Sequence, residues 1–219
     1  HYLFNDAHSG SLNDLKKKKK DLTLTTNLNY LLDKQKSRSH ARRDIFVNQN
    51  DTVRIEEDMN ARLLKRELEG TMTLEGNTDT YFLNNKLNIS AKWNQESGEV
   101  RTPQMISQQV KEPSLQLANN FEYLRRTGKR RFRFQSDISY TAQNTTSRVA
   151  PSLFSYLTQN PTDSLLRQEM SYHLFATNTS FYRSLEGRVS WRYTASLFTN
   201  SYTFHSSLHE TENAVLLSA

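Results

Sequence analysis

The segment FRFQSDISYTA, residues 132–142, decides the fold class of this chain. Its apolar side chains fall on even positions and its charged side chains on odd ones. A period of two is that of an extended strand, so Phe132 and Tyr140 share one face while Arg133 and Asp137 share the other. The pattern predicts a strand with one apolar and one polar face.

The same alternation recurs in segments of about ten residues, the length with which a tilted strand crosses a bilayer. The other clear segments are residues 22–32, 68–74, 83–93, 115–123 and 189–197. Two more strands are expected at residues 11–18 and 169–181. The latter alternates through Met170, Tyr172, Leu174 and Ala176, although Phe175 and Phe181 fall on the other parity. The predicted fold class is all-β: an antiparallel up-and-down meander of about eight long strands, part of a larger transmembrane β-barrel.

The connections between these strands alternate between short and long. Short turns with polar or glycine content are expected near residues 18–21, 76–81, 125–130 and 182–187. Long loops are expected at residues 33–62, 94–113 and 143–167, the first with its own hairpin of residues 44–47 and 52–55. Short turns at one end and long loops at the other are typical of outer-membrane barrels. Residues 1–219 are therefore taken as a single partial barrel segment.

Composition narrows the classes further. No stretch approaches about 18 consecutive apolar residues, so no transmembrane helix is expected, and a mean hydropathy of -0.79 suits a soluble protein or a barrel with a wet interior. The chain has no cysteine and a net charge of +6. The basic clusters at residues 16–20 and 125–131 flank turns and form no basic helix stripe, so nucleic acid is not an expected partner.

Two sets of side chains are candidate functional residues. The apolar parity of the clear strands carries no charge, as a lipid-facing surface requires, although the core of a β-sandwich would exclude charge equally. The lipid-facing or interfacial girdle candidates are Tyr30, Trp93, Phe121, Tyr123, Phe132, Phe134, Tyr140, Trp191 and Tyr193, with Tyr172 as a further girdle residue. The candidates for a water-filled lumen are Lys86, Lys92, Arg133, Asp137, Arg188 and Arg192.

No catalytic, phosphate-binding or zinc motif is present, so neither an enzyme activity nor a cofactor or metal is expected. His205 and His209 would share a metal on a helix, but on a strand they lie roughly 13 Å apart. The acidic run at residues 56–58 is interpreted as a solvated loop rather than a calcium site.

A family resemblance rests on six segments. They are residues 4–8, 11–13, 22–30, 53–57, 83–88 and 103–110. They resemble the barrel of Bacteroidota-type outer-membrane proteins in the TonB-dependent receptor superfamily. The resemblance implies about 22 antiparallel strands preceded by a plug domain, energised nutrient import, and contact through the plug with a TonB-type complex. Outer-membrane lipid and a surface lipoprotein are the further partners that it implies.

Against such a barrel, the chain shows only about eight strands, no signal peptide and no terminal aromatic strand, so it is expected to be an internal fragment. The lysine run at residues 16–20 also departs from the apolar alternation. The leading hypothesis is a wall segment of a TonB-dependent transporter in the bacterial outer membrane. The alternatives are an outer-membrane barrel with a structural or assembly role, and a soluble all-β binding module.

Overall fold

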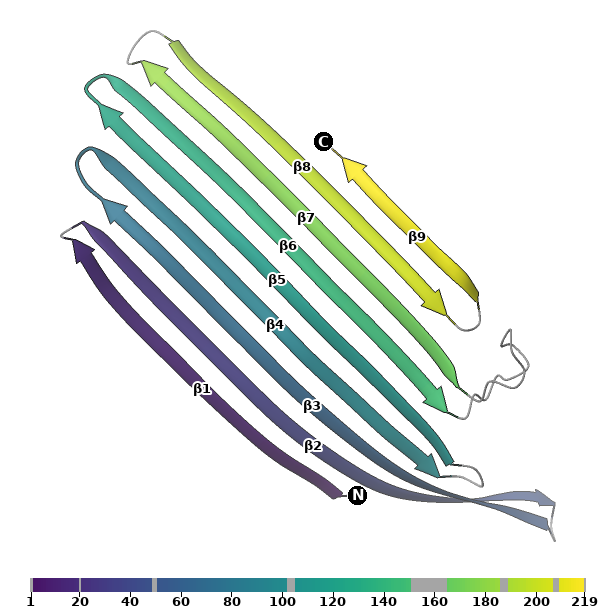
Figure 1. Ribbon diagram of the computed structural model, residues 1–219. Coiled ribbons are helices and arrows are strands. Elements are labelled where there is room, and N and C mark those ends of the chain that lie inside the picture. Colours follow the sequence, from purple (N-terminus) through teal and green to yellow (C-terminus); the bar gives the residue numbers. More distant parts are fainter. Residues whose placement is uncertain are drawn as a thin grey trace.

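The computed structural model describes residues 2–19, 21–48, 51–101, 105–150, 165–185, 189–206 and 209–218. They form one antiparallel sheet in which every strand pairs with its neighbours in the chain (Figure 1). The strands are β1 Tyr2–Lys19, β2 Leu22–Asn48, β3 Asp51–Asn77, β4 Tyr81–Arg101, β5 Met105–Thr127, β6 Arg130–Ala150, β7 Leu166–Leu185, β8 Val189–Ser206 and β9 His209–Ser218. The prediction of an all-β up-and-down meander is confirmed, and β9, with 10 residues, is the one strand that is not long.

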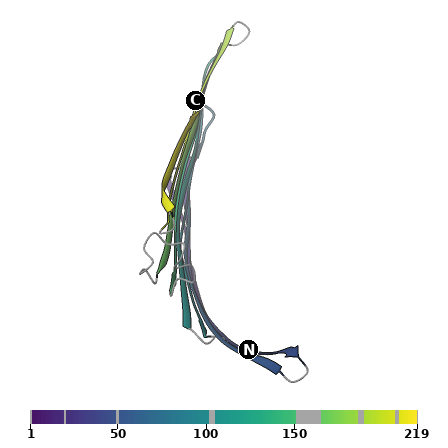
Figure 2. The same cartoon turned by 90° about the vertical axis from the view of Figure 1, so that its right-hand side faces the viewer.

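The sheet is a single curved layer, as the view along its edge shows (Figure 2). Among the described residues, Ala91 is the one buried hydrophobic residue, at 5% exposure, so the described sheet encloses no hydrophobic core. The strands at its two edges, β1 and β9, do not pair with each other in the described part of the chain, and the sheet is open. No helix among the described residues is long and apolar enough to cross a membrane.

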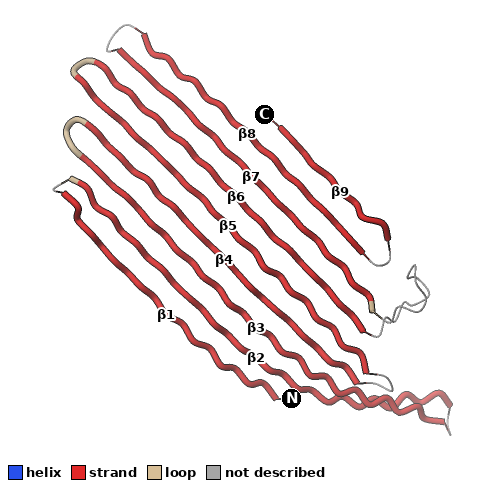
Figure 3. The backbone as a smooth tube through the Cα atoms, viewed as in Figure 1, coloured by secondary structure: helices blue, strands red, loops and turns tan. Residues whose placement is uncertain are grey.

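The strands continue well past the predicted ten residues. The β2–β3 hairpin, with 27 residues in each strand, reaches beyond the neighbouring strands (Figures 1 and 3). The loops predicted at residues 33–62 and 94–113, and the first part of the loop at 143–167, are therefore wrong: the ladder continues there, for example between Asp33 and Lys65. Residues 151–164 lie outside the described part.

The missed extensions have a physical explanation. The sequence shows a strand through its apolar parity only where one face is dry, whereas backbone hydrogen bonds hold the ladder together wherever two strands stay in register. The expected hairpin inside the first long loop is part of this extension, since Asp44 pairs with Arg54 and Ile45 with Val53. Residues 56–58, interpreted as a solvated loop, belong to β3.

The sheet has two ends, which we name by their connections. The turn end holds the connections at residues 78–80 and 128–129, inside the predicted turns at 76–81 and 125–130. Gly128 has a φ of 56° at the first of two connecting residues, as a type II′ hairpin turn requires. The predicted turns at 18–21 and 182–187 contain residue 20 and residues 186–187, which are outside the described residues. The opposite end, with the β2–β3 tip, is the extension end.

The register assigns each side chain to a face, because directly opposed residues of antiparallel strands lie on the same side. The apolar positions of neighbouring strands coincide, and we call their side face A and the other side face B. One row of directly opposed face A residues consists of Leu12, Leu28, Gly70, Ile89, Leu117, Tyr140 and Phe175.

The parity predicted for residues 169–181 is wrong. Phe181 pairs with Phe134 and Phe175 with Tyr140, so the two phenylalanines lie on face A. The set expected there, which includes the predicted girdle residue Tyr172, lies on face B, where Tyr172 pairs with Tyr202 of β8. Both parities of β7 carry apolar side chains, so periodicity alone could not select the face. The register with the neighbouring strands selects it.

Candidate functional site

Face A carries an uncharged band from β2 to β8. In β2 it covers residues 22–32, which span about 33 Å along the strand at roughly 3.3 Å per residue. With the tilt of about 40° found in barrels, this length corresponds to a band about 25 Å tall. The face A positions of the band contain no Lys, Arg, Asp or Glu in residues 22–32, 68–76, 83–93, 113–123, 132–142, 175–181 and 189–197.

The large side chains of this band are open to their surroundings. Trp191 is 57% exposed, Tyr193 60% and Trp93 47%, although hydrophobic residues of this size are usually buried. All nine lipid-facing or girdle candidates that lie in the clear strands are on face A, as the register requires. They are Tyr30, Trp93, Phe121, Tyr123, Phe132, Phe134, Tyr140, Trp191 and Tyr193.

An aromatic cluster occupies the turn end of face A. The ring centroids of Phe132 and Phe181 lie 5.1 Å apart, and those of Phe121 and Phe134 lie 5.8 Å apart, both edge-on. Tyr123 lies 6.1 Å from Phe132 in the same geometry. Such contacts add to the stability that the register provides. Phe181, at the centre of the cluster, was missed in the sequence because the opposite parity of β7 is also apolar.

The first strand is the exception to the uncharged band. Asp14 and Lys16 of β1 lie on face A opposite Thr26 and Leu24. Lys16 Nζ lies 3.1 Å from Asp14 Oδ2, so the two charges form an ion pair. This is where the sequence departs from the apolar alternation, and the uncharged part of face A begins at β2.

Face B carries the polar counterpart of the band. Lys86 and Asp137 lie in one row of directly opposed residues, separated by Asn120. Asn120 Nδ2 donates to Asp137 Oδ1 at 2.8 Å, and in the same row Ser196 Oγ donates to Asn178 Oδ1 at 3.3 Å. The row is a ladder of amides, hydroxyls and charges, the composition of a wall in contact with water.

Two other lumen candidates share a second row nearer the turn end. Arg133 pairs with Tyr182, and Tyr182 pairs with Arg192. Arg133 Nη2 lies 2.7 Å from Glu122 Oε1, to which its Nε also donates at 2.8 Å. The Arg192 guanidinium lies 5.7 Å above the Tyr182 ring, in reach of a cation–π interaction.

The remaining two lumen candidates stand apart from these rows. Lys92 Nζ lies 3.8 Å from Glu67 Oε1 on the neighbouring strand. Arg188 lies outside the described residues. The described candidates thus share face B without converging on one point, and no group of three His, Cys, Asp or Glu side chains that could hold a metal occurs among the described residues.

The polarity of the two faces changes beyond the band, toward the extension end. The face A side chains of β2 and β3 become charged there: Lys34, Lys36, Arg38 and Arg62. In β3 the charge begins one row earlier, at Arg66 opposite Leu32. Face B becomes less polar, and a hollow of about 330 Å³ on it is lined in part by Leu3, Ala61, Leu63 and Val110. Face A is therefore the apolar side of the sheet within the band, but not beyond it.

No protein-family model matches the chain, and no curated protein is similar to it in sequence. The geometry alone defines what the site can do. The sheet can separate an apolar medium on face A from water on face B over a height of about 25 Å.

Proposed function

We propose that this chain forms part of the wall of a β-barrel in the bacterial outer membrane, and that the barrel is a TonB-dependent transporter for nutrient uptake. One observation carries the membrane part of the proposal. A single-layer sheet exposes an uncharged band about 25 Å tall, the height of the apolar band on known barrels. Charged side chains border it, with Lys34 two residues beyond Leu32 and Arg66 directly opposite Leu32.

A soluble binding module explains this surface less well. A β-sandwich would cover face A with a second sheet about 10 Å away, but no such layer lies against the described residues. Side chains such as Trp191 and Ile138 are exposed by 57% and 42%. Hydrocarbon chains would cover them without any further protein layer, which favours the membrane.

The transport part rests on face B and on the family resemblance. Residues such as Lys86, Asp137 and Arg133 would face the interior of a barrel, where water or a plug domain satisfies them. The height and composition of this face suit a wide barrel with a polar lumen. A plug domain and a TonB-type energising complex are implied by the resemblance.

Fractionation of cells that produce the full-length protein tests the membrane location. We expect the protein in the outer-membrane fraction, released only by detergent, with a gel mobility that changes on heating as folded barrels unfold. Recovery in the soluble fraction, with the same mobility before and after heating, would contradict the proposal and support a soluble module.

A second measurement separates transport from a structural role. We expect a plug-like domain in the gene upstream of His1 and a growth defect of the deletion strain that a TonB deletion reproduces. A full-length barrel without a plug domain, whose loss leaves nutrient uptake intact and disturbs the envelope, would instead indicate an assembly role.

A further inference from the structure

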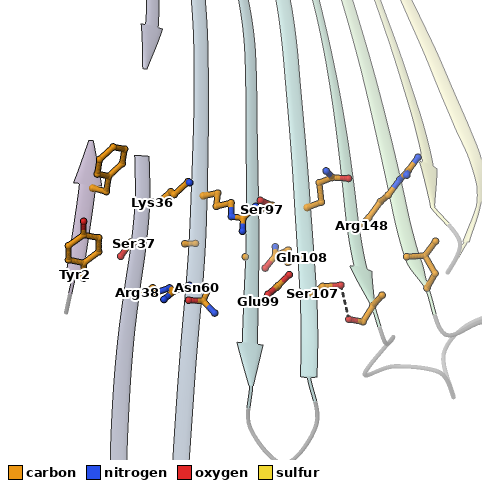
Figure 4. Close-up of a pocket in the computed structure, with 17 residues that line it drawn as sticks. Tyr2, Lys36, Ser37, Arg38, Asn60, Ser97, Glu99, Ser107, Gln108 and Arg148 are labelled. Carbon is orange, nitrogen blue, oxygen red and sulfur yellow. Dashed lines mark hydrogen bonds between the residues drawn. The ribbon is translucent and has the colours of Figure 1, made fainter. Parts of the chain in front are cut away.

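A second feature of face A points to a ligand. A hollow of about 730 Å³ opens on face A just beyond the uncharged band. It is lined by Lys36, Arg38, Arg62 and Arg148, by the rings of Tyr2 and Phe4, and by one carboxylate, Glu99. Figure 4 shows Lys36, Arg38 and Arg148 around it, contributed by strands far apart in the sheet. The charge of the hollow is therefore strongly positive.

The register explains why these cations gather. Lys36 pairs with Arg62, and the same row continues through Ser97 and Gln109 to Arg148. Arg38 lies in the next row, two residues farther along β2. Like charges placed directly opposite each other destabilise a sheet, so the pair Lys36 and Arg62 has a cost that an anionic ligand would offset.

In the described part of the sheet, the cations of this hollow have no anionic partner. Among the described residues, no carboxylate forms an ion pair with Lys36, Arg38, Arg62 or Arg148. The first three side chains are exposed. Arg148 Nε is buried without a hydrogen-bond partner.

The height of the hollow identifies the kind of ligand. Lys36 lies four residues beyond Leu32, the last residue of the uncharged band in β2, which is about 13 Å along the strand and about 10 Å along the membrane normal at a tilt of roughly 40°. The headgroup layer adds about 5–8 Å to each side of the hydrocarbon core. The backbone at Lys36 thus lies a few Å beyond the headgroup layer, and long cationic side chains can reach back into that layer.

We propose that this hollow binds the phosphate headgroup of an anionic membrane lipid, whose acyl chains lie on the neighbouring uncharged band. The inference rests on the proposed membrane wall and adds a ligand to its outer surface. Lys36, Arg38 and Arg62 contact the phosphate, and Tyr2 and Phe4 border the glycerol and the first methylenes. Arginine is suited to this contact because its guanidinium binds phosphate oxygens in pairs.

The test compares two triple variants of the full-length protein in nanodiscs. The discs contain phosphatidylcholine with a minor fraction of phosphatidic acid, and native mass spectrometry counts the lipids that the protein retains after release. The site variant is Lys36→Gln, Arg38→Gln, Arg62→Gln. The control, which removes the same number of cations from face B, is Lys86→Gln, Lys92→Gln, Arg133→Gln.

We expect the native protein to retain phosphatidic acid over phosphatidylcholine by at least about tenfold, from roughly 1 kcal/mol per cation near an anionic surface reduced by screening. The site variant is expected to lose this preference and the control to keep it. Equal retention by the native protein and the site variant would overturn the proposal. Loss of retention when inorganic phosphate is added would also overturn it, since the site would then bind a free anion.

Tryptophan quenching by brominated lipids in the same discs separates this inference from the proposed function. Quenching of Trp93 and Trp191 in the native protein and in both variants shows that each chain is inserted. Quenching without lipid preference contradicts the headgroup site alone. Absence of quenching in the native protein contradicts the membrane wall and the headgroup site together.

Discussion

The two halves of β2 share one strand, one face and one ladder, yet their side chains differ completely. On face A the turn-end half carries Leu24, Leu28 and Leu32, and the extension half carries Lys36 and Arg38. From Leu22 to Arg38 the backbone is paired with both β1 and β3, so strand propensity cannot explain the change. The surroundings of face A must change beyond the band, because Lys34, Lys111 and Glu169 place charges on β2, β5 and β7 in one row of opposed residues.

Face B changes at the same height in the opposite direction. Within the band it presents Glu67 and Lys92, whereas beyond the band it presents Leu63, Ala61 and Val110. A soluble sheet with one fixed core would keep the same face apolar along its whole length. A sheet that leaves a hydrocarbon layer has no such constraint, because beyond the layer both faces meet water or protein.

The largest effect is expected from a cation at the centre of the band. Ile89→Arg should destabilise the inserted protein by about 2–4 kcal/mol, the cost of Arg at the midplane of a barrel. Urea unfolding of the full-length protein from phosphatidylcholine vesicles measures this. The neighbouring change Ser90→Arg, on face B and opposite Glu69, is the control and should cost little.

The same substitution beyond the band sharpens the comparison. Ser107→Arg lies on face A of the extension half, opposite Glu99, and should change the stability by less than about 0.5 kcal/mol, as surface changes do. A cost at Ser107 as large as that at Ile89 would show that face A is dry along the whole strand, contrary to the account.

A smaller effect is expected in the aromatic cluster. Phe181→Leu removes the edge contact to Phe132 and the tilted contact to Tyr193, whose ring centroids lie 5.1 and 6.5 Å away. Aromatic pairs are worth about 0.5–1.5 kcal/mol beyond their buried area, so we expect a loss of about 1 kcal/mol in the same unfolding assay. Phe175→Leu is the matched control, since Phe175 lies on face A of the same strand and stacks on no other ring in the structure's described part. Equal losses would mean that the ring contacts contribute nothing specific.

The smallest effect is expected on face B within the band. The ion pair of Arg133 and Glu122 has side chains exposed by 43% and 29%, and partly solvated pairs contribute about 0.2–1 kcal/mol. A double-mutant cycle of Arg133→Gln and Glu122→Gln should give a coupling free energy in that range. A coupling of several kcal/mol would indicate that face B is as dry as face A.

The sequence predicted the sheet and its two faces wherever one face is apolar. The run at residues 132–142 suffices for β6, and the same rule finds the uncharged band. Of the extended halves of β2 and β3 it found only the hairpin at residues 44–47 and 52–55, because a strand with polar surroundings leaves no period-two pattern. It assigned β7 to the wrong face because Phe175 and Tyr172 compete on opposite parities, and only pairing with β6 decides between them.

For the candidate site, too, the sequence predicted the face of a residue but not its partners on neighbouring strands. Lys86, Lys92, Arg133, Asp137 and Arg192 were predicted to lie on the polar face because alternation fixes the face. Their partners, such as Glu122 and Tyr182, depend on the register between strands, which one strand's sequence does not contain. The cations around the hollow were hidden for the same reason, since Lys36 and Arg62 are far apart in the chain and were placed in a loop.

The chain has no cysteine, so single introduced thiols can report which positions meet water. The proposal that the uncharged band faces lipid is tested by the rates at which Leu28→Cys, Asn29→Cys and Lys36→Cys react with a membrane-impermeant maleimide in intact vesicles. We expect the thiol at position 36 to react rapidly, the thiol at position 29 to react measurably and the thiol at position 28 to be protected. Equal reaction of Leu28 and Lys36 would contradict it, because both lie on face A and differ only in the medium that the band is proposed to meet.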